Sequence, residues 1–285
     1  MTATINLSKS TLFEMVMEAF EAYAVKHDGK KVIAIETHAQ LWGKINKTHP
    51  FKCSIEHFSV DSSAIKTRGS VTTNPLSLDI KKDIAQAFGE NYSHLGTFHT
   101  HPWVNNELYG KNSKGEDIRV TTPNVIRKHK LFDFSNGDHL CEINEPTITV
   151  GEKKYSIALV MTIFAAKKAD DKRDGPMDID DGIGITIGTN TIEFSLGNIK
   201  LWLHARVYEH KATDTLTEDD KKSLNRYKLT EHSDFNENKG TMPIPLDTDL
   251  ECDVDFFLEG FGRLKMSSRK AEYRTSSIAE KRWFV

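Results

Sequence analysis

Residues 95–102 have the sequence LGTFHTHP and form the most informative segment of the chain. The pattern predicts a strand over 95–100 that Pro102 ends, because proline cannot donate to a central ladder. Side chains two residues apart on a strand point to the same side, so His99 and His101 can face one metal ion. Catalytic zinc usually has three protein ligands and one open position for water, so the pair requires a third ligand.

Two other segments supply candidate side chains for such a site. In FSNGD, residues 134–138, the spacing places Ser135 and Asp138 on one face of a turn or helix start, where Asp138 could be a ligand. Ser135 taken alone is equally compatible with a plain helix N-cap. Upstream, Glu36 lies in a β-forming apolar segment, where a buried carboxylate is costly without a partner. Taken alone, Glu36 is also compatible with an exposed strand position.

The rest of the pattern alternates between helices and strands, which favours an α/β sandwich. Apolar residues at helical spacing predict a first helix at about 11–26, and Asn74-Pro75 opens a second amphipathic helix. Strands are expected at 31–44, 51–60, 65–71, 157–166, 183–187 and 191–208, the last with a turn at Gly197-Asn198.

Polar segments define the expected domain organisation. Residues 103–130 are polar and irregular, which is long for a loop in a compact domain, and 167–181 is expected to be a second loop. After His210 the character changes, with a short charged helix beginning near Thr217. We therefore expect a core domain at 1–210, with a loop insertion at about 103–134, and a C-terminal extension of unknown role at 211–285.

The bulk composition excludes several classes of function. The net charge is −3 over 285 residues, with no sign of the clustered basic surface that nucleic-acid binding needs. The three cysteines are far apart, so neither a disulfide framework nor a cysteine-based zinc cluster is indicated. The chain begins without a secretory signal pattern. Its longest apolar run, 157–166, is too short to span a bilayer. We expect a cytoplasmic protein without a membrane or nucleic-acid partner.

Taken together, these segments resemble the JAMM motif of MPN+ metallopeptidases, E…H-[S/T]-H-P…S-x-x-D. Glu36 is followed seven positions later by Gly43, and Gly96 precedes the histidine pair as in that motif. The resemblance covers roughly residues 8–208. It implies the MPN (JAMM, cytidine-deaminase-like) fold, a sandwich of a mixed, curved β-sheet flanked by helices, here with a C-terminal extension.

The resemblance also implies a site and a reaction. One zinc ion would be held by His99, His101 and Asp138, with a water in the fourth position. Glu36 would act as the general base and Ser135 would donate a hydrogen bond to the oxyanion. The family's familiar reaction is hydrolysis of an amide at the C-terminus of ubiquitin or a ubiquitin-like protein, commonly an isopeptide. We therefore expect a deubiquitinase-like zinc isopeptidase whose partners are such modifiers and their conjugates.

One spacing departs from the family pattern. The family usually has seven residues between the second histidine and the serine, whereas residues 102–134 intervene here. We interpret this segment as an insertion over the site. The competing assignment, Ser113 with Glu116 or Asp117, lacks the hydrophobic segment that follows Asp138.

Other readings of the motif are open but weaker. A non-catalytic MPN scaffold within a larger assembly typically lacks one or more of the site residues, all of which are present in this chain. A metallo-β-lactamase needs H-x-H-x-D-H, but Trp103 and Val104 follow Pro102. An amidohydrolase barrel needs about 250 residues, more than follow His101. Zinc deaminases need a P-C-x-x-C run that the sequence lacks.

Overall fold

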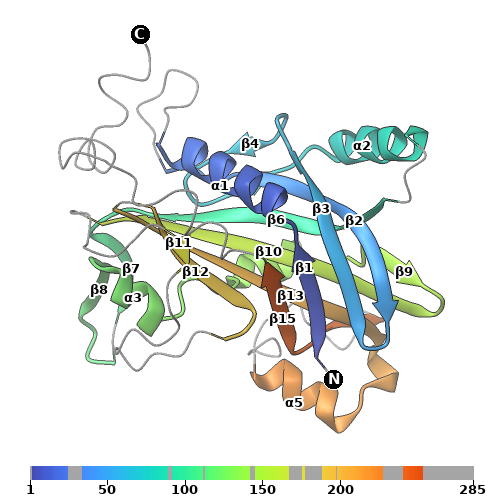
Figure 1. Cartoon of the computed structure of the whole chain (residues 1–285). Coiled ribbons are helices and arrows are strands. Elements are labelled where there is room, and N and C mark those ends of the chain that lie inside the picture. Colours follow the sequence, from blue (N-terminus) through green and yellow to red (C-terminus); the bar gives the residue numbers. More distant parts are fainter. Residues whose placement is uncertain are drawn as a thin grey trace.

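The computed structural model describes residues 2–24, 34–88, 92–111, 113–141, 145–166, 175–176, 188–196, 198–226 and 240–252. Within these ranges the chain is a mixed α/β structure built on one curved, nearly closed sheet with few helices beside it (Figure 1). The strands of this sheet are β1 (Ala3–Leu7), β2 (His38–Thr48), β3 (Phe51–Val60), β6 (Ser93–Trp103), β9 (Ile148–Val150), β10 (Lys153–Ala165), β11 (Gly175–Pro176), β12 (Thr191–Leu196), β13 (Ile199–Ala212), β14 (Thr241–Pro245) and β15 (Thr248–Cys252).

The remaining elements are two small hairpins and the helices. The hairpins pair β4 (Ile65–Lys66) with β5 (Val71–Thr72) and β7 (Glu107–Lys111) with β8 (Asp117–Val120). The helices are α1 (Lys9–Ala24), α2 (Pro75–Ala87), α3 (Pro123–Lys128), α4 (Asn136–Cys141), α5 (Glu218–Arg226) and one 3₁₀ turn (Thr213–Thr215). No helix in the described part of the chain is long and apolar enough to cross a bilayer.

The strand β6 occupies the middle of the sheet. The path through the sheet is β11-β12-β13-β10-β6-β2-β3-β1-β15, with β14 on β13 and β9 on β10. β6 runs antiparallel to β2 and parallel to β10, the most hydrophobic strand. A Cβ added at Gly96 would lie 1.8 Å from the carbonyl oxygen of Ile157, so only glycine allows β6 to approach β10 this closely. A Cβ at Gly43 would likewise lie 1.9 Å from the Ser54 carbonyl oxygen across β2 and β3.

Contrary to expectation, Pro102 does not end its strand. β6 continues to Trp103, and Pro102 pairs with Ile163 of β10. On the other side, the β2–β6 pairing begins only at His99. Because the Thr100 N–H points toward the β2 side, where it reaches the Thr37 carbonyl, position 102 also faces that side. The missing N–H of proline therefore falls where β2 no longer needs a donor.

The C-terminal strands complete the sheet. β15 pairs in parallel with β1, and β14 pairs with β13. The Leu250 N–H donates to the Thr189 carbonyl at 3.0 Å, and the Val207 N–H donates to the Thr248 hydroxyl at 3.2 Å, which ties β15 to the opposite end of the sheet. Residues 241–252, which follow the boundary expected at residue 210, therefore belong to the same sheet as β1.

The two long helices are attached in different ways. α1 buries Leu12, Met15 and Tyr23 in the main core, and the Tyr23 hydroxyl donates to the Trp103 carbonyl at 2.9 Å. α2 begins at the predicted Asn74-Pro75 cap but buries none of its residues. Its apolar side chains are exposed, and Lys81 holds it to the sheet through the buried Asp61 carboxylate at 2.5 Å.

The insertion is a folded unit, and the expectation of an irregular loop was wrong. It contains β7, β8 and α3, and Arg127 of α3 forms a bidentate ion pair with the Glu193 carboxylate of β12, at 3.1 and 2.9 Å from Nε. The Trp202 indole N–H donates to the same carboxylate at 2.7 Å. A second hydrophobic cluster anchors the insertion to β10 and β13; its members are Val120, Ile126, Leu131, Phe132, Phe164 and Trp202.

Three further expectations differ from the structure. The segment expected as a strand at 31–44 becomes β2 only from His38, so Glu36 lies on the irregular segment that enters the strand. The expected strand at 65–71 is the β4–β5 hairpin. The strand expected at 183–187 and most of the loop expected at 167–181 lie outside the described residues. The turn expected at Gly197-Asn198 falls between β12 and β13, which pair in antiparallel fashion up to Leu196 and Ile199, but Gly197 itself lies outside the described residues.

Candidate metal centre

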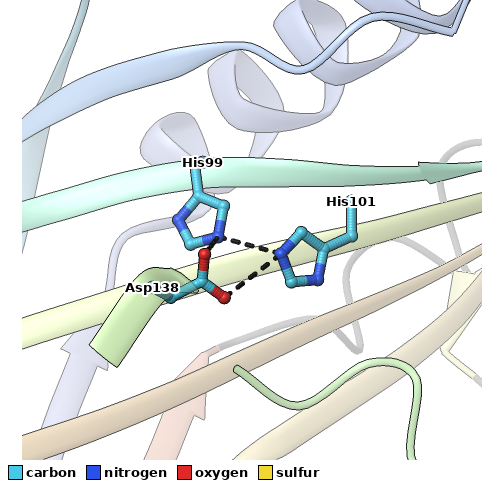
Figure 2. A group of neighbouring side chains, drawn as sticks. All are labelled: His99, His101 and Asp138. Atoms are coloured by element: carbon cyan, nitrogen blue, oxygen red, sulfur yellow. Dashed lines mark hydrogen bonds and ion pairs between the residues drawn. The ribbon is translucent and has the colours of Figure 1, made fainter. Parts of the chain in front are cut away.

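His99 and His101 project from β6 toward one point. Figure 2 shows the two imidazoles, both from β6, and the Asp138 carboxylate converging on one point. The Nε2 atoms of the histidines are 3.1 Å apart. His99 is buried and His101 is half-buried, so the first lies against the sheet and the second at the edge of a cavity.

Asp138 is delivered by the first turn of α4. The Asp138 N–H donates to the Ser135 hydroxyl at 3.3 Å, and the Ser135 N–H donates to Asp138 Oδ2 at 2.5 Å. This reciprocal pair is a capping box, with aspartate in the place usual for glutamate, and it fixes the carboxylate at the helix start. Both interpretations of Ser135 are therefore compatible: it caps α4, and because its oxygen accepts that bond, its own O–H can point elsewhere.

The three side chains lie close enough together to share one metal ion. Asp138 Oδ1 lies 3.1 Å from His99 Nε2, and Oδ2 lies 3.3 Å from His101 Nε2. Zinc–ligand bonds of 2.0–2.1 Å at tetrahedral angles place ligand atoms about 3.3 Å apart. Among the described residues, this group has ligand atoms within 4.8 Å of one another, and Glu36 is not part of it. The donor set of two imidazoles and one carboxylate, with one position left over, fits zinc.

The charges around Asp138 keep its carboxyl group ionised. Burial raises the pKa of the Asp138 carboxyl, but the neighbouring His99 and His101 outweigh it and hold that pKa well below its usual range. The carboxylate is therefore ionised at neutral pH, which metal binding requires. A carboxylate in such a setting favours a positively charged partner at the point where the two imidazoles meet.

A pocket of about 940 Å³ opens beside these ligands and brings in the two other predicted residues. Glu36 and Ser135 line it together with His101. The backbone N–H of Glu36 donates to the Thr67 carbonyl at 2.7 Å, which fixes the segment entering β2. Glu36 is half-buried and Ser135 is exposed, so each side chain is open to a bound substrate.

The insertion forms one wall of this pocket. Trp103, Tyr109 and His129 make an aromatic row, with ring centroids 6.1 Å apart for the first pair and 5.5 Å apart for the second. Glu107 at the start of β7 pairs with Arg68 at 2.9 Å, which joins the β4–β5 hairpin to the insertion across the pocket. A substrate entering the pocket would therefore contact the insertion.

The alternative acidic residues of the insertion lie elsewhere. Glu116 and Asp117 are exposed on the β7–β8 hairpin, and Asp117 pairs with Arg119 at 3.2 Å. Neither belongs to the group formed with the two histidines. The structure thus brings Asp138 to the histidines across the whole insertion.

Residues behind the site were not foreseen. Phe134 contacts the rings of His99, His139 and His204, with centroids 6.4, 6.1 and 5.3 Å away. Asp133 next to it bonds to His204 and Arg206 on β13. The sequence carried one signal for them: β13 alternates His204 and Arg206 with apolar residues, the pattern of a strand with one polar face.

Comparison with known proteins does not assign the chain to a family. No protein-family model and no curated protein matches it. A solution structure of protein DSY2949 from Desulfitobacterium hafniense matches 88% of this chain and 96% of its own length, at 10% identity and a TM-score of 0.35.

Proposed function

We propose that the chain is a zinc-dependent peptidase of the JAMM/MPN+ type, with the MPN sandwich as its fold. One observation carries the proposal: His99, His101 and Asp138 form a three-ligand cluster beside a pocket that Glu36 and Ser135 also line. Chance pairing of two histidines does not account for the matching carboxylate or for the two further residues in the same cavity. The mixed, curved sheet with flanking helices is compatible with that fold.

Zinc bound by these three residues would lower the pKa of a water and polarise the scissile carbonyl. The Glu36 carboxylate then accepts the proton of the attacking water and later delivers it to the leaving nitrogen. Glu36 lies outside the ligand cluster but lines the same pocket as His101, which is the place that a general base requires. The Ser135 O–H donates to the oxyanion that forms on the substrate carbonyl.

We propose as substrate an amide at the C-terminus of ubiquitin or of a ubiquitin-like protein. The resemblance of the motif to that of the JAMM family supports this class. An open pocket with an aromatic wall has room for an extended chain and for the group that leaves. A non-catalytic scaffold would not need Glu36 and Ser135 in the same cavity as the ligands.

The test compares zinc-loaded wild-type protein with Glu36→Gln on a panel of ubiquitin-like conjugates and linear fusions. The variant should keep its zinc and lose about 10²–10⁴-fold in kcat, because the general base is gone while the ligands remain. Glu107→Gln is a matched control, since Glu107 lines the same pocket but pairs with Arg68. Turnover by Glu36→Gln close to that of the wild type would reject the role of Glu36.

A further inference from the structure

Asp133 sits where three donors from two parts of the chain meet. Its Oδ1 atom accepts from the Phe134 backbone N–H at 2.8 Å, from Arg206 Nη2 at 2.9 Å and lies 3.1 Å from His204 Nε2. Arg206 and His204 are both buried, whereas the Asp133 side chain is 30% exposed at the pocket. We call this set (Asp133, His204 and Arg206) the Asp133 anchor.

The Asp133 anchor joins the 134–138 turn to the part of the sheet that carries His99. In the sheet, His204 of β13 pairs with Val160 of β10, and Val160 pairs with His99 of β6. These three residues form one row across the sheet, and paired residues in a row point to the same face. Phe134 lies over this row, packed with Val160 and in contact with the rings of both histidines.

A metal ligand at this place needs such an external support. α4 has only six residues and follows a long insertion, so the helix alone cannot fix Asp138 relative to β6. A metal site tolerates ligand displacements of only about 0.5 Å. Residues that orient metal ligands without touching the metal typically contribute a factor of about 10–100 in affinity.

We propose that Asp133 is a positioning residue: through Arg206 and His204 it holds the 134–138 turn so that Asp138 reaches the metal. This inference rests on the proposed function and adds a determinant of zinc affinity that the JAMM pattern does not contain. Asp133 acts by fixing the backbone and the Phe134 ring, and the ligands themselves stay unchanged.

The experiment measures zinc affinity by chelator competition in Asp133→Ala and Asp133→Asn. Asp133→Ala should raise the zinc Kd about 100-fold, and Asp133→Asn, which keeps an acceptor for the Phe134 N–H, about 10-fold. In metal-free protein, hydrogen exchange of residues 134–138 should be faster in both variants than in the wild type. This second readout reports the turn itself, without zinc or activity.

Glu209→Gln is the matched control, because Glu209 on β13 also pairs with basic side chains, Lys153 of β10 at 2.9 Å and Lys211 of β13 at 3.7 Å. Within the described part of the chain, no ion pair joins it to the 134–138 turn. This variant should leave the zinc Kd within about twofold of the wild type. A wild-type zinc Kd in both Asp133 variants would overturn the positioning role of Asp133 and leave the proposed function standing. A wild-type chain that binds no zinc would overturn the anchor and the proposed function together.

Discussion

Gly96→Ala tests whether the close approach of β6 and β10 sets the geometry of the site. The new Cβ would lie 1.8 Å from the Ile157 carbonyl oxygen and 2.7 Å from its carbon. The first distance is roughly 1.5 Å shorter than ordinary contact, so the strands must move apart. Because the obstacle is backbone and cannot rotate away, we expect the upper part of the overpacking range, about 3 kcal/mol.

The assay is urea denaturation of metal-free protein, supported by thermal unfolding. A loss of about 3 kcal/mol corresponds to a fall in Tm of about 5–10 °C for a chain of this size. Since His99 lies three residues further along β6, zinc affinity should fall as well. Gly110→Ala is the control: nothing lies within 4 Å of its added Cβ, so its stability should change by less than about 0.5 kcal/mol. An equally small change in Gly96→Ala would refute this reasoning.

Two further predictions concern pH and the oxyanion donor. Burial lowers the pKa of His94 to about 4, whereas an unfolded histidine titrates near 6.5. The unfolded chain therefore binds more protons below pH 6.5, and the free energy of unfolding should fall by up to about 3 kcal/mol as the pH drops toward 4. His94→Gln should reduce that slope in urea titrations, and an unchanged slope would contradict the assignment. Ser135→Gly should lower kcat about 10²–10³-fold, yet cost only a few tenths of a kcal/mol as a helix cap. A kcat within a few-fold of the wild type would exclude the serine as donor.

The sequence was most informative where local pattern and chemistry coincide. The strand over 51–60 and the helix start at Asn74-Pro75 both have short-range signals, and both are present. The histidine pair followed from the two-residue period of a strand. Asp138 followed from its three-residue spacing to Ser135, although the whole insertion separates it from His101.

The remaining features depend on contacts that local pattern cannot show. The insertion folds because Ile126 and Leu131 pack against Phe164 and Trp202, which lie far along the chain. β15 is a short strand whose partner, β1, is at the other end of the sequence. The apolar side chains Leu76, Ile80 and Ile84 of α2 had the right spacing for a buried face but are exposed, and Ser77 and Lys81 join the helix to Asp61 by polar bonds. Asp133 was missed because its partners lie on β13.

Metal analysis of purified protein tests the central claim most directly. The wild-type chain, loaded with zinc and dialysed, should hold one zinc ion per chain by elemental analysis. His101→Ala, prepared in the same way, should hold almost none, because the two ligands that remain are too few for a stable zinc site. Wild-type protein without zinc, or full occupancy in His101→Ala, would contradict the account.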